Sequence, residues 1–191
     1  MPLAEPDSAI CGGCGDAIGH SDRIDRCIAA LSYEFPVDRL VTGLKYRHRL
    51  ECARVLGELL SIRMLEEAGE PGFCLPDLIV PVPLHTTRLL KRGFNQAAEI
   101  ARWVSQTMHI PRDFRLVRRV RNTPGQTGLS RSARLQNMHG AFSLAAPVAG
   151  ARIALLDDVI TTTATVAALA ELLKKGGARE VQVWAPARTI R

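Results

Sequence analysis

The stretch Arg152–Val166, which reads RIALLDDVITTTATV, decides the fold of this chain. Its first part, Ile153–Leu156, is an apolar run with the length and composition of a buried strand. Its last part opens a helical pattern that runs from Ala164 to Lys175 and is followed by Gly176 and Gly177, where glycine commonly ends a helix. A buried strand that leads directly into a helix predicts an α/β fold.

Two adjacent acids and a run of threonines separate that strand from that helix. We expect the backbone amides of Thr161–Thr165 to point outward at the start of the helix, where they bind anions such as a phosphate monoester. The carboxylates of Asp157 and Asp158 can accept hydrogen bonds from vicinal sugar hydroxyls or hold Mg²⁺. A bare acid pair would more often be a helix cap and a solvated side chain. The full order of strand, acids, threonine loop and helix favours a sugar-phosphate site.

The rest of the chain continues the alternation of strands and helices. Further strands are predicted at Ile28–Glu34, Leu78–Val82, Phe114–Val120, Ala141–Leu144 and Val181–Trp184. Helices are predicted after Pro36, over Leu50–Glu67, and from Asn95 to about Thr107. This alternation predicts a parallel sheet of about five strands with helices on its faces. Ligands of such sheets bind beyond the carboxyl ends of the strands, here after Val82 and Leu156.

Composition and charge limit the classes of function. Of the 191 residues, 47% are hydrophobic, so a core can form, and no apolar run is long enough to span a membrane. The first ten residues have no apolar stretch, so we expect no signal peptide and a cytoplasmic location. The net charge is +6, and seven arginines fall between Arg112 and Arg134. They indicate a phosphate or nucleic-acid partner, although a solvated basic surface explains a charge excess equally well.

The acid pair and its loop resemble the 5-phosphoribosyl 1-pyrophosphate signature of type I phosphoribosyltransferases. That resemblance implies that Asp157 and Asp158 hold the ribose hydroxyls, with Mg²⁺ as cofactor. It also implies that the loop holds the 5-phosphate, through Thr161, Thr162, Thr163, Ala164 and Thr165. Thr163 departs from the signature because the family usually has glycine there. Threonine is costly if that position requires a positive φ.

Three other patches narrow the resemblance. They are LKYR at Leu44–Arg47, PVPLHTTRLLKRGFNQ at Pro81–Gln96, and RRVRNTPGQTGLSRSARLQNMHGAF at Arg118–Phe142. With the acid-pair segment, their order and spacing resemble the ComF family, which is linked to natural competence and DNA uptake and related to the protein GntX. The resemblance covers the chain from about Cys27 onward. It implies a phosphoribosyltransferase-like domain at residues 27–191 and a reduced zinc-ribbon-like appendage at residues 1–26.

The same resemblance places the pyrophosphate after the strand at Leu78–Val82. Its candidate contacts are His85, Arg88, Lys91, Arg92, Arg121 and Arg131. Gly93 would allow close backbone approach, and Asn95 would cap the next helix. The alternatives are an amphipathic helix with a basic face over Leu84–Leu90 and a structural role for His85. The segment Arg121–Arg134 is rich in residues that break regular structure, and we expect it to close over bound pyrophosphate.

The five cysteines do not form a disulfide framework. Cys11 and Cys14 are one Cys-x-x-Cys pair of the zinc ribbon that ComF proteins usually carry, and no second pair follows. Zinc requires four ligands, and His20 and Cys27 are poorly spaced to complete the set. Bound zinc is therefore not expected.

Two hypotheses for function follow. In the first, the chain is a phosphoribosyltransferase that uses 5-phosphoribosyl 1-pyrophosphate and Mg²⁺ with an unspecified acceptor. In the second, it is a non-catalytic DNA-uptake protein that binds single-stranded DNA and uses the sugar-phosphate pocket for regulation. A turnover assay across nucleobases separates the two.

Overall fold

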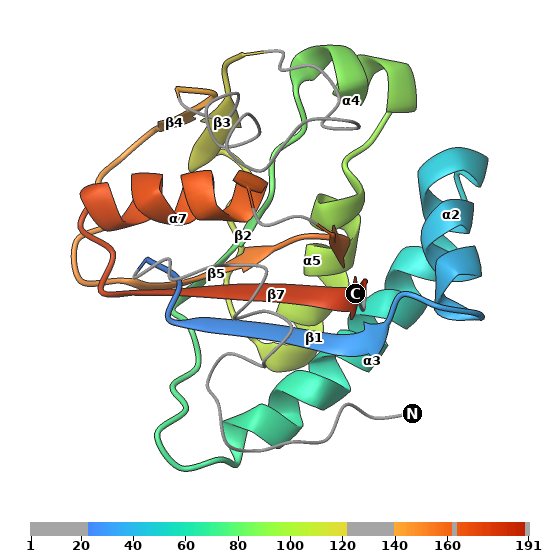
Figure 1. The fold of residues 1–191 in the computed structure, drawn as a ribbon, viewed down its shortest axis with the longest axis horizontal. Helices are drawn as coiled ribbons and strands as arrows, with labels where there is room; N and C mark the ends of the chain where they lie inside the picture. The colour runs from blue at the N-terminus through green and yellow to red at the C-terminus, as the bar shows by residue number, and fades with distance from the viewer. Residues whose placement is uncertain (1–22, 122–139, 162–163, 190–191) are drawn as a thin grey trace.

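The fold is taken from a computed structural model, which describes residues 23–121, 140–161 and 164–189. Its main sheet has five strands, all paired in parallel (Figure 1). The order across the sheet is β1 (Arg26–Ser32), β7 (Glu180–Arg188), β5 (Arg152–Leu156) and β2 (Leu78–Pro81), and β6 (Val159–Ile160) pairs with β7 beyond the end of β5. The predicted α/β class and the predicted parallel sheet of about five strands are confirmed.

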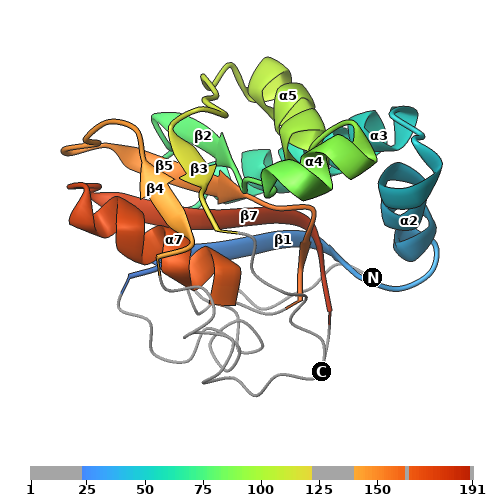
Figure 2. The ribbon, with the colours of Figure 1, turned by 90° about the horizontal axis from the view of Figure 1, so that it is seen from above.

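Helices cover both faces of the sheet (Figure 2). On one face lie α2 (Val37–Arg47), α3 (Glu51–Ala68) and α5 (Gln96–Met108). On the other lies α7 (Ala164–Lys175), together with a separate antiparallel ribbon of β3 (Val117–Arg119) and β4 (Phe142–Leu144). The short helix α4 (Thr86–Arg92) follows β2 and has no buried residue.

The two cores follow from the alternation of side chains along the strands. Val183 and Leu155 face the α7 side, whereas their neighbours Trp184 and Leu156 face the side of α3 and α5, and all four are fully buried. Successive residues of a strand point to opposite faces, so a strand covered on both sides must be apolar throughout. This is why Ile153–Leu156 reads as a continuous apolar run.

Three predicted strands differ markedly in length or in the sheet that they join. The final strand was expected to end at Trp184, but β7 continues to Arg188 through Pro186. The predicted strands at Phe114–Val120 and Ala141–Leu144 form the short antiparallel ribbon and lie outside the main sheet. Most of the predicted appendage at residues 1–26 lies outside the described residues, which start at residue 23. Strand β1 begins at Arg26.

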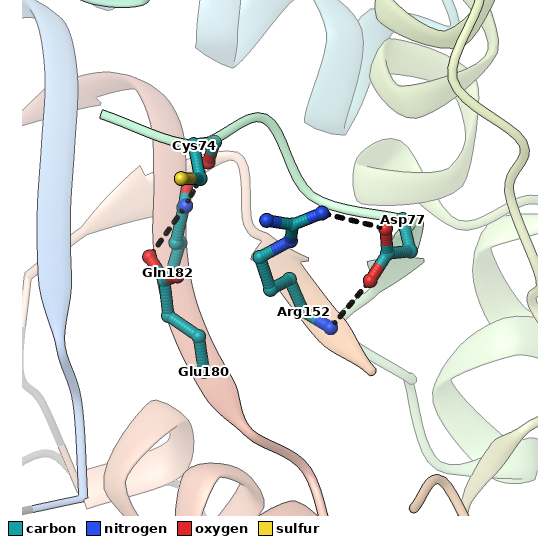
Figure 3. A network of polar contacts seen from close by, with 5 residues as sticks. All are labelled: Cys74, Asp77, Arg152, Glu180 and Gln182. Atoms are coloured by element: carbon teal, nitrogen blue, oxygen red, sulfur yellow. Dashed lines mark hydrogen bonds and ion pairs between the residues drawn. The ribbon is translucent and has the colours of Figure 1, made fainter. Parts of the chain in front are cut away.

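A polar network joins the amino ends of the strands (Figure 3). The buried Gln182 side chain donates from Nε2 to the Cys74 carbonyl oxygen and to Glu180 Oε1, both at 2.8 Å, and Oε1 of Gln182 accepts from Trp184 Nε1 at 2.9 Å. Beside it, the Arg152 backbone N–H donates to Asp77 Oδ2 at 2.8 Å, which lowers the pKa of Asp77. These bonds satisfy a polar side chain inside the sheet and lie at the end opposite to the acid pair.

Among the described residues, none of the helices combines the length and the apolar character needed to cross a membrane.

Candidate functional site

The acid pair lies in a gap of the sheet between β5 and β6. Both strands pair with β7 in one continuous register, Leu156 with Trp184 and Val159 with Ala187. The backbone N–H of Asp157 donates to the Trp184 carbonyl oxygen at 3.0 Å. In a parallel ladder, the N–H of residue 186 would donate to the Asp157 carbonyl oxygen. Residue 186 is proline, however, and has no N–H. The ladder therefore opens where the two acids lie, at the carboxyl end of β5.

Lys45 forms an ion pair with one of the two acids, Asp158. It projects from the last turn of α2, and its Nζ lies 2.8 Å from Asp158 Oδ2. The side chains of Lys45 and Asp158 are only 21% and 13% exposed, so the pair is little screened by solvent. The backbone N–H of Asp158 donates to Asp157 Oδ1 at 2.8 Å. The two carboxylates are thus held by different partners.

Asp157 differs from an ordinary carboxyl group in its titration. Its pKa is raised to about 7, first by burial and then by the neighbouring Asp158 carboxylate. The Asp158 backbone N–H and the Lys45 ammonium group act in the opposite direction. Near neutral pH, the group therefore exchanges between an acid that donates a hydrogen bond and a carboxylate that accepts one.

Arg119, on the β3–β4 ribbon, interacts electrostatically with Asp157. Its pKa is lowered by burial and then by the charge of Arg88, whereas the charge of Asp157 raises it. The guanidinium group also lies over the ring of Phe142, its partner in β4, at 5.6 Å from the centroid. Arg119 thus lies within electrostatic range of a second cation, Arg88, and of Asp157. Two neighbouring guanidinium groups suit a highly charged anion.

The sequence did not single out Arg119, although the patch Arg118–Phe142 contains it. Two arginines stand side by side in β3, and only the pairing of the ribbon decides which one turns inward. Arg118 is exposed and Arg119 is half-buried.

The other pyrophosphate-side candidates after β2 are His85, Lys91 and Arg92, which lie on or directly before α4. His85 Nδ1 accepts from the Thr87 backbone N–H at 3.2 Å and caps α4, which gives His85 a structural role. The Arg92 guanidinium lies over the Tyr46 ring, 5.7 Å from its centroid, and Lys91 is exposed. A helix does form in this segment, as the alternative predicted, but α4 buries none of its leucines.

The turn after α4 follows the prediction. Gly93 ends the helix with a φ of +80°, a conformation that favours glycine. Asn95 Oδ1 accepts from the Ala97 backbone N–H, which caps α5, and Asn95 Nδ2 donates to the Val82 carbonyl oxygen, both at 3.0 Å. One side chain therefore ties the start of α5 to the carboxyl end of β2.

The predicted phosphate loop is described at its two ends. Thr161 is exposed directly after β6, and α7 begins at Ala164, with Thr165 in its first turn. Thr162 and Thr163 lie outside the described residues, as does the departure from the glycine of the signature. Arg131 and most of the segment Arg121–Arg134 also lie outside them. Arg121 itself is exposed and next to Gly140.

The acid pair fits Mg²⁺ only as part of a larger ligand set. In the described part of the chain, no group of three or more His, Cys, Asp or Glu side chains is placed to hold a metal ion. The pair offers two carboxylates, and Mg²⁺ is usually held by one or two carboxylates together with substrate phosphates. Cys11, Cys14 and His20 lie outside the described residues. Cys27 is buried in β1 within the core on the α7 side.

Comparison with known proteins identifies relatives along most of the chain. No protein-family model matches it. It is 38% identical over 177 residues to DNA utilization protein YhgH of Escherichia coli (strain K12), covering 93% of this chain and 78% of that protein. It is 35% identical over 178 residues to Competence protein F of Haemophilus influenzae, covering 92% and 78%.

Solved structures give weaker matches. A purine phosphoribosyltransferase from Pyrococcus horikoshii is 16% identical with a TM-score of 0.40, covering 86% of this chain and 87% of that one. The UMP synthase of Leishmania donovani is 15% identical with a TM-score of 0.42, covering 78% and 29%. With TM-scores below 0.5, neither likeness bears on the site.

Proposed function

The chain belongs to the family of DNA utilization protein YhgH and Competence protein F. From that premise, we propose that it binds 5-phosphoribosyl 1-pyrophosphate together with Mg²⁺ and transfers the phosphoribosyl group to an acceptor. The observation that carries this proposal is the acid pair in the gap between β5 and β6. Arg119 lies within electrostatic range of Asp157, and a helix starts a few residues later.

We assign the sugar end of the ligand to the acid pair. Asp157 and Asp158 accept hydrogen bonds from the two vicinal ribose hydroxyls. The 5-phosphate lies at the start of α7, where the helix dipole favours an anion. Thr161 adds a hydroxyl donor from the end of β6. Along the chain, the acid pair, Thr161 and the start of α7 follow one another in the same order as the hydroxyls and the phosphate of the proposed ligand.

The pyrophosphate end requires positive charge. Arg119 and Arg88 supply it, since Arg119 lies within electrostatic range of both Asp157 and Arg88. Guanidinium groups bind phosphate oxygens in a bidentate way. Mg²⁺, when bound, neutralises part of the negative charge of the pyrophosphate. The protein contributes by orienting the sugar and stabilising the leaving pyrophosphate.

The test of transfer is release of pyrophosphate. The full chain is mixed with the sugar pyrophosphate, Mg²⁺ and each nucleobase in turn, and free pyrophosphate is measured. Base-dependent release that is absent from Asp157→Asn/Asp158→Asn supports an enzyme. Saturable binding of the sugar pyrophosphate with no release from any base would contradict transfer to a nucleobase and leave binding alone.

A second candidate function is binding of single-stranded DNA, with the sugar-phosphate pocket as a regulatory site. A basic and aromatic surface where α2 and α4 meet favours it. The Tyr46 side chain is 71% exposed there, with Arg92 over its ring and the exposed Arg47 and Lys91 beside them in sequence. Aromatic rings stack with bases, and cations bind the phosphate backbone.

A further inference from the structure

The described structure places a cation of its own at the acid pair, the ammonium group of Lys45. Its Nζ lies 2.8 Å from Asp158 Oδ2, a distance at which an ammonium group makes a direct, charge-assisted hydrogen bond. Both side chains are largely buried, so solvent weakens the attraction much less than it would at the surface.

Lys45 is presented from a fixed position. His48 ends α2 in the left-handed conformation with a φ of +53°, and its ring meets the Phe94 ring edge-on at a centroid distance of 5.6 Å. Two residues earlier in α2, the Tyr46 ring lies beneath the Arg92 guanidinium group. These two contacts join the end of α2 to the end of α4 and to Phe94. The backbone of Lys45 is therefore held in place, and its side chain contacts Asp158 directly.

We propose that the Lys45 ammonium group occupies the position of a metal ion at Asp158 and keeps a divalent cation from binding there by itself. The inference rests on the proposed function, because it concerns how that site acquires Mg²⁺. A divalent cation that approached the pair without the sugar pyrophosphate would be repelled by the ammonium group and would find one carboxylate already neutralised. The pair gains a divalent cation only when the phosphates bring further oxygen ligands and negative charge with it.

The test is a titration of the full chain with Mn²⁺ alone, followed by electron paramagnetic resonance. The sugar pyrophosphate is left out, so a failure of the proposed function cannot alter the result. We expect Lys45→Met to bind one Mn²⁺ at least about tenfold more tightly than the unaltered chain. Lys45→Met/Asp158→Asn should lose that gain, and Lys45→Arg, which keeps the charge, should show none.

A matched control removes a different lysine–carboxylate pair. Lys175 Nζ lies 2.9 Å from Glu171 Oε1 on α7, so Lys175→Met changes the net charge equally without touching the acid pair, and it should not change Mn²⁺ affinity. Lys45→Gln is measured beside Lys45→Met, so that a folding defect of one variant does not decide the result. Equal Mn²⁺ affinity of the unaltered chain and of whichever of these two variants is folded would overturn the inference.

Discussion

Asp157 donates its backbone N–H to the carbonyl oxygen of Trp184 at 3.0 Å, the last ladder hydrogen bond before β5 and β7 part. Pro186 cannot return a bond from the next position. The opening leaves the Asp157 side chain half-buried beside a second carboxylate, and this placement raises its pKa to about 7. A backbone feature of the sheet thus sets the chemistry of the site.

Asp157 should make the stability of the protein depend on pH. Because its pKa is higher in the folded chain than the ordinary 3.8, the folded state keeps a proton that the unfolded state releases. That stabilisation is present at low pH and is lost as the pH rises through about 7. Between pH 5 and pH 8, the free energy of unfolding should fall by about 2–3 kcal/mol more for the unaltered chain than for Asp157→Asn. Urea denaturation at both pH values measures this difference, and parallel changes in the two proteins would contradict it.

Arg119 should matter for ligand binding far more than its neighbour. We expect Arg119→Met to weaken binding of the sugar pyrophosphate by about tenfold to a hundredfold, the effect of losing charge-assisted hydrogen bonds to phosphate. Arg118→Met removes the same charge from the exposed position next to it and serves as the matched control. Calorimetric titration compares the two. Similar losses of affinity in both variants would mean that binding depends only on the net charge of the protein and not on the position of Arg119.

Asn95 should contribute to the stability of the fold through both of its side-chain hydrogen bonds. Asn95→Ala removes both the cap of α5 and the bond to the Val82 carbonyl oxygen, so it should lower the free energy of unfolding by about 1–2 kcal/mol. Asn95→Asp keeps the acceptor that caps the helix and loses only the donor to Val82. We expect it to recover part of that loss in denaturant unfolding. An unchanged stability of Asn95→Ala would refute the double role.

Tyr46 should contribute to single-stranded DNA binding if that second function holds. We expect weak binding whose affinity falls steeply with salt, by a slope of about −0.7 in log K against log salt for each phosphate contact. Tyr46→Ala should reduce the binding free energy by about 1 kcal/mol or more through lost stacking. Phe114, another exposed aromatic with an arginine over its ring, gives the matched control Phe114→Ala. Absence of binding at low salt, measured by fluorescence anisotropy, would exclude this function.

Local signals predicted the elements around the acid pair closely. The helix at Ala164–Lys175 has the predicted bounds, because glycines follow its last turn. The strand predicted at Ile153–Leu156 is present and begins one residue earlier, at Arg152. It could be predicted because an apolar run of this length is typical of a strand that is buried on both faces. Asn95 was assigned its cap correctly from its place before a helical pattern.

Contacts between distant segments could not be read from local patterns. Lys45 and Asp158 are far apart in sequence, and their ion pair depends on how α2 packs beside the sheet. Arg119 turns inward only because of the ribbon that β3 forms with β4. The length of β7 was underestimated because proline is normally a barrier to a central strand. Here the missing N–H of Pro186 coincides with the gap that holds the acids.

The most direct test of the account is calorimetric titration of the full chain with 5-phosphoribosyl 1-pyrophosphate and Mg²⁺. The account predicts saturable binding to the unaltered chain and no detectable binding to Asp157→Asn/Asp158→Asn, with circular dichroism showing that the variant is folded. Asp77→Asn, which changes an acid at the opposite end of the sheet, should bind as the unaltered chain does. Unchanged affinity of the folded double variant would contradict the assignment of the acid pair to the ribose.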